Sequence, residues 1–328
     1  MIEMGSGLYQ VAYIPVVLVS VAIGLQLYSM ALVQPPMGPL IEAYLKSCTY
    51  LETTPLRGFI CVIEPLFQEL MSNDIGKSFI TAFGTSGAVM STYLHTRGGE
   101  RNGSRLFSPL ILIAHSLAGQ VFGAGIVGPI FLPAISALSN TLAPANARPS
   151  SPPTYAYTAT LLCMQFSVFL LSMALSGLPP THENWPYVNY AFQAFPLLFL
   201  PLAFFPSTPV HKATPTPTTT ISAFTAFKYL YAPLWWVTIA QGLNAYFRAG
   251  VEFTPACYFM ALDFAGFVLT FIGLYAVDVV AGEAQKAMGV GRMLGGLVVV
   301  GPASTMATYF ERRQKVVIER AEKERLRM

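Results

Sequence analysis

A single carboxylate in the middle of a long apolar segment is the first candidate for chemistry. Residues 252–278 are predicted to form one membrane-spanning helix, because a hydrocarbon core of about 30 Å requires about 20 apolar residues, and Asp263 lies near the centre of this stretch. A charged side chain at that depth costs about 2.5–3.5 kcal/mol on insertion scales. We therefore expect Asp263 to face the interior of a helical bundle, either as a general acid or only as a hydrogen-bond partner of a neighbouring helix.

A second carboxylate, Glu64, lies in a shorter segment. Residues 58–74 are too short and too acidic to span a membrane, and they fit an amphipathic or re-entrant helix. Glu64 and Glu69 are five positions apart, so on a helix they point in nearly opposite directions and at most one faces inward. Glu64 follows an apolar run and precedes Pro65, which makes it the better candidate. The alternative is an interfacial carboxylate in water.

Further polar and aromatic residues are candidates for binding a substrate. They are Trp235, Trp236, His115, Tyr246, Arg248 and Glu252. Tryptophan rings stabilise a cation in an apolar pocket, or they anchor a helix at the membrane interface. A lone histidine such as His115 shares a proton with a nearby acid or simply packs. Arg248 and Glu252 either pair across one helical turn or line the mouth of a cavity above Asp263.

Missing motifs exclude several kinds of chemistry. The chain has no DDxxD or NDxxD motif, no HExxH, no GxSxG, no P-loop and no GxGxxG followed by an acidic residue. The four cysteines lack metal-ligand spacing. We therefore expect no metal and no cofactor. A buried acid in an aromatic, apolar pocket remains, and the chemistry that needs only these groups is proton-initiated isomerisation or cyclisation.

The composition is typical of a polytopic membrane protein. Hydrophobic residues make up 54% of the chain and charged residues 11%, and the mean hydropathy is +0.53, whereas soluble domains carry about 25% charged residues. The net charge of +3 does not indicate nucleic-acid binding, because the positive charge is concentrated at the C-terminus. We predict an all-α fold, with one transmembrane helical bundle over residues 1–310 and a solvated, basic cytoplasmic tail over residues 311–328.

Apolar runs separated by proline, glycine and polar clusters predict about eight transmembrane helices. Their approximate ranges are 10–33, 75–94, 106–138, 154–177, 188–206, 222–241, 254–278 and 289–310. The third is long enough to be tilted, or broken near Gly128-Pro129. The first lacks a basic n-region and is long for a signal peptide, so we interpret it as a retained span.

Basic residues in short loops predict the orientation in the membrane. The arginine-containing loop 95–105 and the basic tail should both be cytoplasmic, and eight spans place both termini on that side. The sequon at Asn102 should then stay unmodified. Cys48 and Cys61 could form a disulfide if their loop is lumenal, and the sequence leaves that pairing open.

One stretch carries a family resemblance. Residues 67–106 (FQELMSNDIGKSFITAFGTSGAVMSTYLHTRGGERNGSRL), with the eight-span layout and the basic tail, resemble the fungal membrane-bound terpene cyclases of the ascochlorin and ascofuranone type. The resemblance implies protonation of a terminal epoxide on a farnesylated aromatic molecule, followed by ring closure in a secondary-metabolite pathway. It includes no catalytic motif, so the roles of Asp263 and Glu64 rest on the burial argument alone.

Our leading hypothesis is a metal-independent integral membrane terpene cyclase, expected in the endoplasmic reticulum. Asp263 would be the general acid, Glu64 would tune its proton, and Trp235 with Trp236 would form the wall that stabilises the cation. The substrate would be a lipophilic prenylated small molecule that enters from membrane lipid, and other enzymes of the pathway are candidate partners. A transporter or channel that uses the same carboxylates for ion or proton coupling is the alternative, and a non-catalytic membrane scaffold is a third hypothesis.

Overall fold

The computed structural model describes residues 6–48, 57–100, 104–142, 152–205 and 217–325. All regular elements among these residues are helices, and no strand occurs in them. The predicted all-α class is therefore confirmed for the described part of the chain.

The helical elements follow one another along the described residues in a single order. They are α1 (Ser6–Tyr28), η1 (Ser29–Val33), α2 (Met37–Ser47), α3 (Arg57–Ser72), α4 (Asp74–Gly99), η2 (Arg105–Phe107), α5 (Pro109–Phe122), α6 (Ala124–Thr141), α7 (Tyr155–Gly177), α8 (Trp185–Gln193), η3 (Phe195–Phe204), α9 (Pro217–Phe247), α10 (Pro255–Val280), α11 (Ala284–Ala287), α12 (Val290–Val299) and α13 (Pro302–Arg325).

Several of these helices are suited to a membrane. Five stretches of the described residues are long and apolar enough to cross a bilayer: Val11–Val33, Ala124–Thr141, Tyr155–Gly177, Trp185–Phe204 and Pro255–Val280. The predicted count of eight is not confirmed. The helices α4 and α9 cover two further predicted spans, but neither is among these five.

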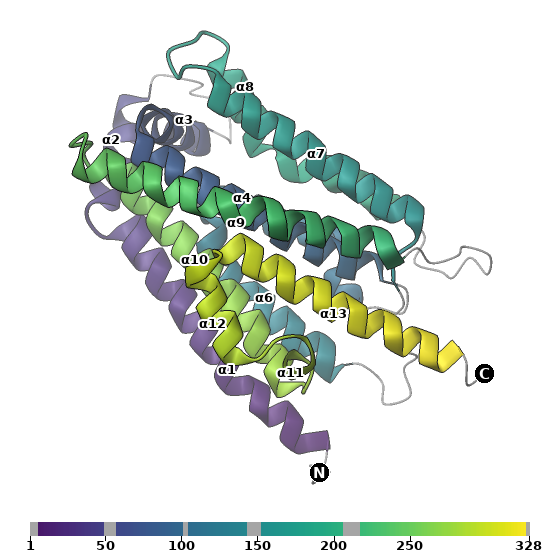
Figure 1. The fold of residues 1–328 in the computed structure, drawn as a ribbon. Coiled ribbons are helices and arrows are strands. Elements are labelled where there is room, and N and C mark those ends of the chain that lie inside the picture. The colour runs from purple at the N-terminus through teal and green to yellow at the C-terminus, as the bar shows by residue number, and fades with distance from the viewer. Residues whose placement is uncertain (1–5, 49–56, 101–103, 143–151, 206–216, 326–328) are drawn as a thin grey trace.

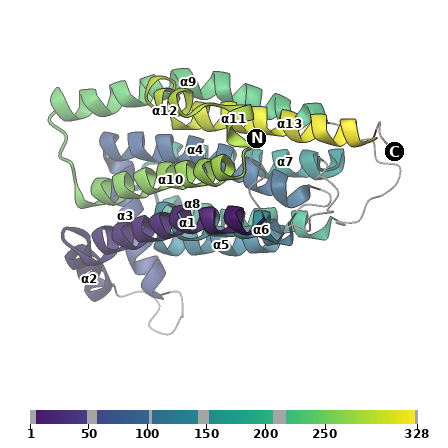
Figure 2. The ribbon, with the colours of Figure 1, turned by 90° about the horizontal axis from the view of Figure 1, so that it is seen from below.

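The long helices lie side by side between two ends of the bundle (Figure 1). We call one the terminal end, because α1 begins there and α13 ends there. We call the other the α3 end, because α2 and α3 lie there. Turned by 90°, the bundle shows α9, α12 and α13 on one side, α1, α5 and α6 on the other, and α4 and α10 between them (Figure 2). The helix α10 therefore contacts both sides.

The stretch predicted as the third span does not cross the bundle as one helix. The chain turns at Gly123, where φ is +93°, and this turn separates α5 from α6. The contacts of Arg97 show that the start of α5 lies near the end of α6. Its guanidinium lies 4.0 Å from the centre of the Phe107 ring, just before α5, and its Nη1 donates to Ser136 Oγ near the end of α6 at 3.2 Å. The two helices form a hairpin that enters from the terminal end and returns to it.

The stretch predicted as the last span is also a hairpin. The chain turns at Gly301, where φ is +84°, between α12 and α13. Arg312 Nη1 donates to the carbonyl oxygen of Ala287 at 3.2 Å, so the start of α12 lies beside α13. In both hairpins a glycine with positive φ reverses the chain, because side-chain-bearing residues rarely adopt that conformation. The expectation that 106–138 and 289–310 each cross once is corrected accordingly.

The predicted boundary of the basic tail is also corrected. The helix α13 continues without interruption through residue 311 to Arg325. Glu311 and Gln314 are buried, and Gln314 Nε2 donates to Glu100 Oε1 at 3.3 Å. The first part of the predicted tail is therefore packed against the bundle near the end of α4, whereas a solvated tail was expected.

An ionic cluster fastens α13 to α10 near the terminal end. Asp278 Oδ2 accepts hydrogen bonds from Tyr309 Oη at 2.6 Å and from Arg313 Nε at 2.9 Å. The Tyr93 ring of α4 stacks on Phe310 with 3.7 Å between ring centres. The sequence marks Asp278 only as an acid near a helix end, and its packing role depends on residues more than 30 positions away.

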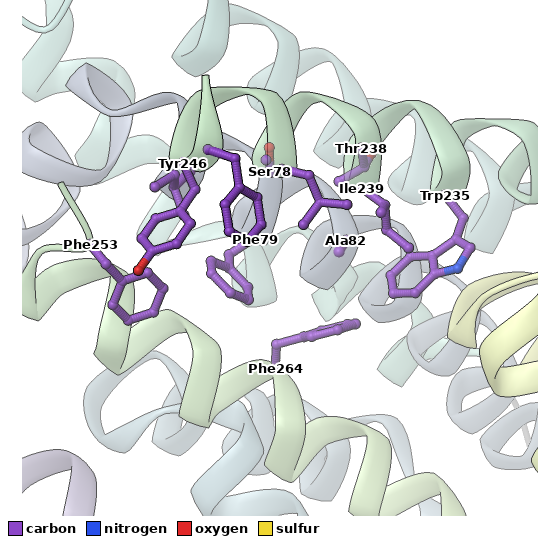
Figure 3. A pocket seen from close by; sticks show the side chains of 13 residues that line it. Ser78, Phe79, Ala82, Trp235, Thr238, Ile239, Tyr246, Phe253 and Phe264 are labelled. Carbon is purple, nitrogen blue, oxygen red and sulfur yellow. The ribbon is translucent and has the colours of Figure 1, made fainter. Parts of the chain in front are cut away.

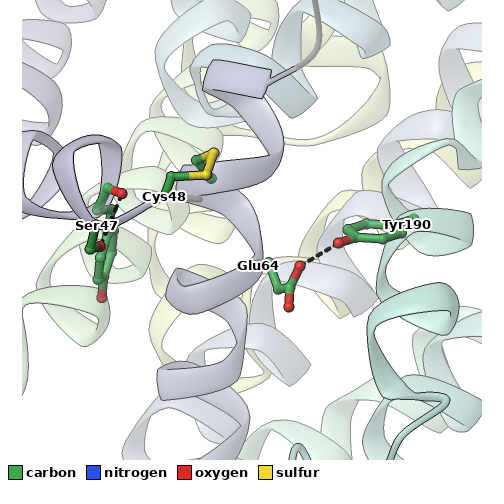
Figure 4. The surroundings of a disulfide bond; sticks show 6 residues. Ser47, Cys48, Glu64 and Tyr190 are labelled. Atoms are coloured by element: carbon green, nitrogen blue, oxygen red, sulfur yellow. Dashed lines mark hydrogen bonds between the residues drawn. A yellow bond between two sulfur atoms is a disulfide. The ribbon is translucent and has the colours of Figure 1, made fainter. Parts of the chain in front are cut away.

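At the α3 end a disulfide joins Cys48 to Cys61 (Figure 4). It connects the residue after α2 to the first half of α3. The pairing that the sequence leaves open is therefore present in the structure.

Candidate functional site

An elongated pocket of about 530 Å³ lies between α4, α9 and α10 (Figure 3). Ligand pockets for small molecules commonly measure about 300–1,000 Å³. Aromatic rings form much of its wall, among them Phe79 of α4, Trp235 and Tyr246 of α9, Phe264 of α10, and Phe253 in the connection before α10. The pocket is thus large enough for a small molecule and suited to an apolar one.

The two ends of the pocket differ. We call the end at Trp235 the inner end, because along α9 it is farther from the α3 end. The ring centres of Trp235 and Phe264 are 6.3 Å apart. Tyr246, Phe247 and Phe253 lie toward the other end, and Figure 3 shows Tyr246 and Phe253 opposite Trp235. Phe247 is 74% exposed and Tyr246 is 51% exposed. The pocket therefore opens among exposed apolar side chains toward the α3 end.

None of the described residues that line the pocket carries a charge. The polar side chains there are the hydroxyl groups of Ser78, Thr238 and Tyr246 and the indole of Trp235. Ser78 Oγ already donates to the carbonyl oxygen of Asp74 at 2.9 Å. Charged groups such as diphosphates would lack a partner in this pocket, so its chemistry favours an uncharged ligand.

Asp263 lies at the tip of the α5–α6 hairpin. The backbone N–H of Gly125 donates to Asp263 Oδ1 at 2.6 Å. Gly125 is in the first turn of α6, where N–H groups lack partners within the helix and a carboxylate is favourable. The Asp263 side chain is 5% exposed, and no described residue forms a hydrogen bond with its Oδ2. Asp263 therefore caps a helix inside the bundle with one oxygen and leaves the other unpaired.

Glycines make this close approach possible. A Cβ added to Gly125 would lie 1.7 Å from the carbonyl oxygen of Asp263, and one added to Gly266 would lie 2.0 Å from the carbonyl oxygen of Gly125. Small residues commonly let membrane helices pack backbone against backbone. Asp263 does not line the aromatic pocket, although its neighbour Phe264 does.

Glu64 has a different set of neighbours. The Tyr190 hydroxyl of α8 donates to Glu64 Oε2 (Figure 4), and the Tyr44 hydroxyl of α2 donates to Glu69 Oε2 at 3.0 Å. Burial, together with the Glu69 carboxylate, raises the pKa of Tyr44. The two carboxylates of α3 thus point to different helices, and no hydrogen bond between described residues joins Glu64 to Asp263. The hypothesis that Glu64 tunes the proton of Asp263 gains no support from a contact.

The two adjacent tryptophans cap the tip of the α12–α13 hairpin. Trp235 Nε1 donates to the carbonyl oxygen of Val298 at 3.3 Å, and Trp236 Nε1 donates to that of Val299 at 2.9 Å. These carbonyls belong to the last turn of α12, where no N–H of the helix can reach them. Trp235 also lines the pocket, whereas Trp236 does not and is 54% exposed.

The remaining predicted site residues are scattered. His115 lies in α5, 6.5 Å from Phe131 between ring centres, and its Nε2 is buried without a hydrogen-bond partner among the described residues. Arg248 and Glu252 are exposed, and within the described chain they form no ion pair with each other. Of the predicted residues, the structure brings only Trp235 and Tyr246 into the pocket.

Sequence reasoning missed the α4 wall of the pocket. Ile75, Ser78, Phe79 and Ala82 all line it, and their spacing of three and four is the pattern of one helical face. That pattern is visible in the sequence, but it cannot show which helices face it. The described residues contain no group of three or more His, Cys, Asp or Glu side chains placed to hold a metal ion.

Comparisons with known proteins assign no family. No family description matches the chain, no curated protein is significantly similar to it, and no solved structure matches its fold. The resemblance to fungal terpene cyclases therefore stays a prediction.

Proposed function

We propose that the protein is an integral membrane terpene cyclase that binds an epoxidised prenyl chain in the aromatic pocket. The observation that carries the proposal is the pocket itself, which is apolar, uncharged and open among exposed apolar side chains. Its aromatic faces would stabilise developing positive charge, and its apolar wall would keep water from quenching a cation. A farnesyl chain attached to an aromatic head is the proposed substrate.

Asp263 is the proposed general acid. A proton on Oδ2 can leave without disturbing the hydrogen bond that Oδ1 accepts from Gly125. The proton passes to the epoxide oxygen, the C–O bond at the more substituted carbon breaks, and the nearest alkene supplies the electron pair for the new ring bond. The cyclised cation then loses a proton to the Asp263 carboxylate, which gives the neutral product and restores the acid. Asp263 and Phe264 are consecutive on α10, so the mechanism requires the epoxide to reach past the Phe264 ring.

The test is product formation by membranes that contain the protein. Microsomes are supplied with an epoxyfarnesyl phenol, and the cyclised isomer is separated by chromatography. Asp263→Asn keeps an oxygen that accepts from Gly125 but cannot donate the carboxyl proton, so we expect a stable protein without product. Glu64→Gln is the matched variant of the second carboxylate, and we expect it to retain product. No cyclised product from the unmodified protein contradicts the proposal, and product that persists in Asp263→Asn contradicts the assigned acid.

A second candidate function is favoured by the α5–α6 hairpin. Transporters place substrate and ion sites at helix ends inside the bundle, and the α5–α6 tip with its buried Asp263 is such a place. In this chain, side chains already form hydrogen bonds with backbone groups of the helix ends at both tips. Proton-coupled flux across proteoliposomes that is lost in Asp263→Asn would favour a transporter over the cyclase.

We also propose that the terminal end faces the cytoplasm and the α3 end the lumen of the endoplasmic reticulum. Disulfides persist in oxidising compartments, which suits the α3 end with its Cys48–Cys61 bond. The arginines and lysines of α13 lie at the other end, in keeping with the positive-inside rule. A sequon introduced between α2 and α3 should be glycosylated, and the native one at Asn102 should not. The reverse pattern contradicts the orientation.

A further inference from the structure

We infer that Gly301 determines the length of the prenyl chain that the aromatic pocket accepts, and that it acts by positioning Trp235. The inference rests on the proposed function in one respect, since it takes the ligand to be a prenyl chain. It adds that the pocket discriminates between chains by their length. It also assigns a role to the α12–α13 hairpin, which contributes no residue to the pocket wall itself.

Gly301 lies directly behind the inner wall of the pocket. A Cβ added to Gly301 would lie 2.4 Å from Cγ of Trp235 and 2.7 Å from Cδ2 of the same ring. No real Cβ comes that close to a neighbouring atom, so the indole would have to move. The absence of a side chain at this position therefore allows the Trp235 ring to lie where it does.

The indole of Trp235 is held on three sides. Its Nε1 donates to the carbonyl oxygen of Val298 at 3.3 Å, its ring lies against the backbone of Gly301, and Phe264 approaches with 6.3 Å between ring centres. The remaining face lines the pocket. A change at the hairpin tip would thus move the inner end of the pocket along α9.

The span from Trp235 to Tyr246 gives the pocket a defined length. The two residues lie on α9, about three helical turns apart, which corresponds to roughly 16 Å. That is about the length of an extended farnesyl chain. The chain would enter with its apolar end first, since the inner end is aromatic and the hydroxyl of Tyr246 lies at the outer end.

The test measures binding without catalysis. The protein is placed in lipid nanodiscs, and geraniol, farnesol and geranylgeraniol compete with a photoreactive farnesol analogue for covalent labelling. We expect the unmodified protein to bind farnesol best. In Gly301→Ala the indole is pushed into the pocket, and we expect about a tenfold loss of farnesol affinity with geraniol now preferred.

Two further variants keep the inference falsifiable. Gly282 also has a positive φ, +72°, but nothing lies within 4 Å of a Cβ added there. Gly282→Ala therefore controls for backbone strain, and it should bind the three alcohols in the same order of affinity as the unmodified protein. Trp235→Ala removes the wall without changing the glycine, and the preference should shift toward geranylgeraniol. If Gly301→Ala does not fold, Trp235→Ala alone decides the question.

The outcomes separate this inference from the proposed function. An unchanged order of the three alcohols in Trp235→Ala overturns the inference, as does an equal effect of Gly301→Ala and Gly282→Ala. A shifted length preference in a protein that forms no cyclised product supports the inference and contradicts the cyclase. Labelling that none of the alcohols displaces contradicts a prenyl ligand altogether.

Discussion

The two helical hairpins satisfy the same requirement with groups of opposite character. A helix end leaves backbone groups without partners, and each unsatisfied group costs several kcal/mol in an apolar surrounding. At the α5–α6 tip the carboxylate of Asp263 accepts from an N–H at the start of α6. At the α12–α13 tip two indole N–H groups donate to carbonyls at the end of α12.

The surroundings of the two tips also differ. The first tip is pressed against α10 with glycine backbones in contact, and none of its residues lines the pocket. The second tip lies behind Trp235, which forms part of the pocket wall. The comparison indicates that the first tip fixes Asp263 against the start of α6, and that the second tip shapes the binding site.

The largest expected effect is at the first tip. In Gly125→Ala the new methyl group would overlap the carbonyl oxygen of Asp263, so we expect a loss of about 3 kcal/mol or more in the free energy of unfolding. Unfolding in mixed detergent micelles measures it. Gly295→Ala on α12 is the matched control, because nothing lies within 4 Å of its Cβ position. Equal stability of the two variants would contradict the packing described for the first hairpin.

Removal of the first cap should have the next largest effect. Asp263→Ala leaves the Gly125 N–H without a partner inside the bundle, and we expect a loss of about 1–3 kcal/mol. Asp263→Asn retains an accepting oxygen and should lie close to the unmodified protein in the same unfolding experiment. If both variants lose the same stability, the hydrogen bond to Gly125 is not what Asp263 contributes.

Removal of one indole cap should have a smaller effect. Trp236→Phe keeps a ring but loses the N–H that reaches Val299, and the exposed position lets the local structure adjust, so we expect about 0.5–1.5 kcal/mol. Because Trp236 does not line the pocket, farnesol binding should be unchanged. A loss larger than that of Asp263→Ala would reverse the proposed ranking of the two tips.

The smallest expected effect is a local loosening of the α12–α13 hairpin at acidic pH, near Glu311 at the end opposite its tip. Burial alone would raise the pKa of Glu311, but Lys315 and Lys228, at 2.6 and 3.2 Å, outweigh it and hold that pKa below its ordinary value of 4.5. A carboxylate with a lowered pKa stabilises the fold above its unfolded pKa, and this contribution is lost as the pH falls through the folded value. The base of the α12–α13 hairpin should therefore loosen below pH 4.5.

Amide hydrogen exchange of α13, compared with that of α6, measures this loosening. Glu311→Gln removes this titrating group and should reduce the pH dependence of exchange in α13, where the ion pair of Asp278 with Arg313 remains. Hydrogen exchange in α6 should not accelerate below pH 4.5, because the hydrogen bond from Arg97 to Ser136 near the end of α6 involves no carboxylate. Parallel acceleration of both helices would contradict a local cause.

The all-α class and several apolar helices long enough to cross a membrane could be predicted, because long apolar runs leave little choice of structure. The reversals at Gly123 and Gly301 could not, since an apolar run with glycine and proline can either cross the bilayer or turn back. The turn at Gly123 is stabilised by the hydrogen bond from the Gly125 N–H to Asp263, which lies 138 positions after Gly125. The buried position of Asp263 follows from its sequence surroundings, but its partner does not.

The pocket, too, could be predicted only in part, because the sequence does not show which distant residues come together. The sequence predicts Trp235 and Tyr246 as separate substrate-binding candidates, whereas the wall also needs Phe79 of α4 and Phe264 of α10. A single helical face is visible as a periodic pattern, but the assembly of three faces depends on packing across the whole chain.

The most direct test of the account is to map where a prenyl ligand binds. A photoreactive farnesol analogue is cross-linked to the protein in membranes, and the labelled peptides are identified by mass spectrometry. We predict labelling of α9 between Trp235 and Phe247 and of α10 around Phe264, suppressed by excess farnesol. Suppressible labelling confined to α3 and α8 around Glu64 and Tyr190 would contradict the account.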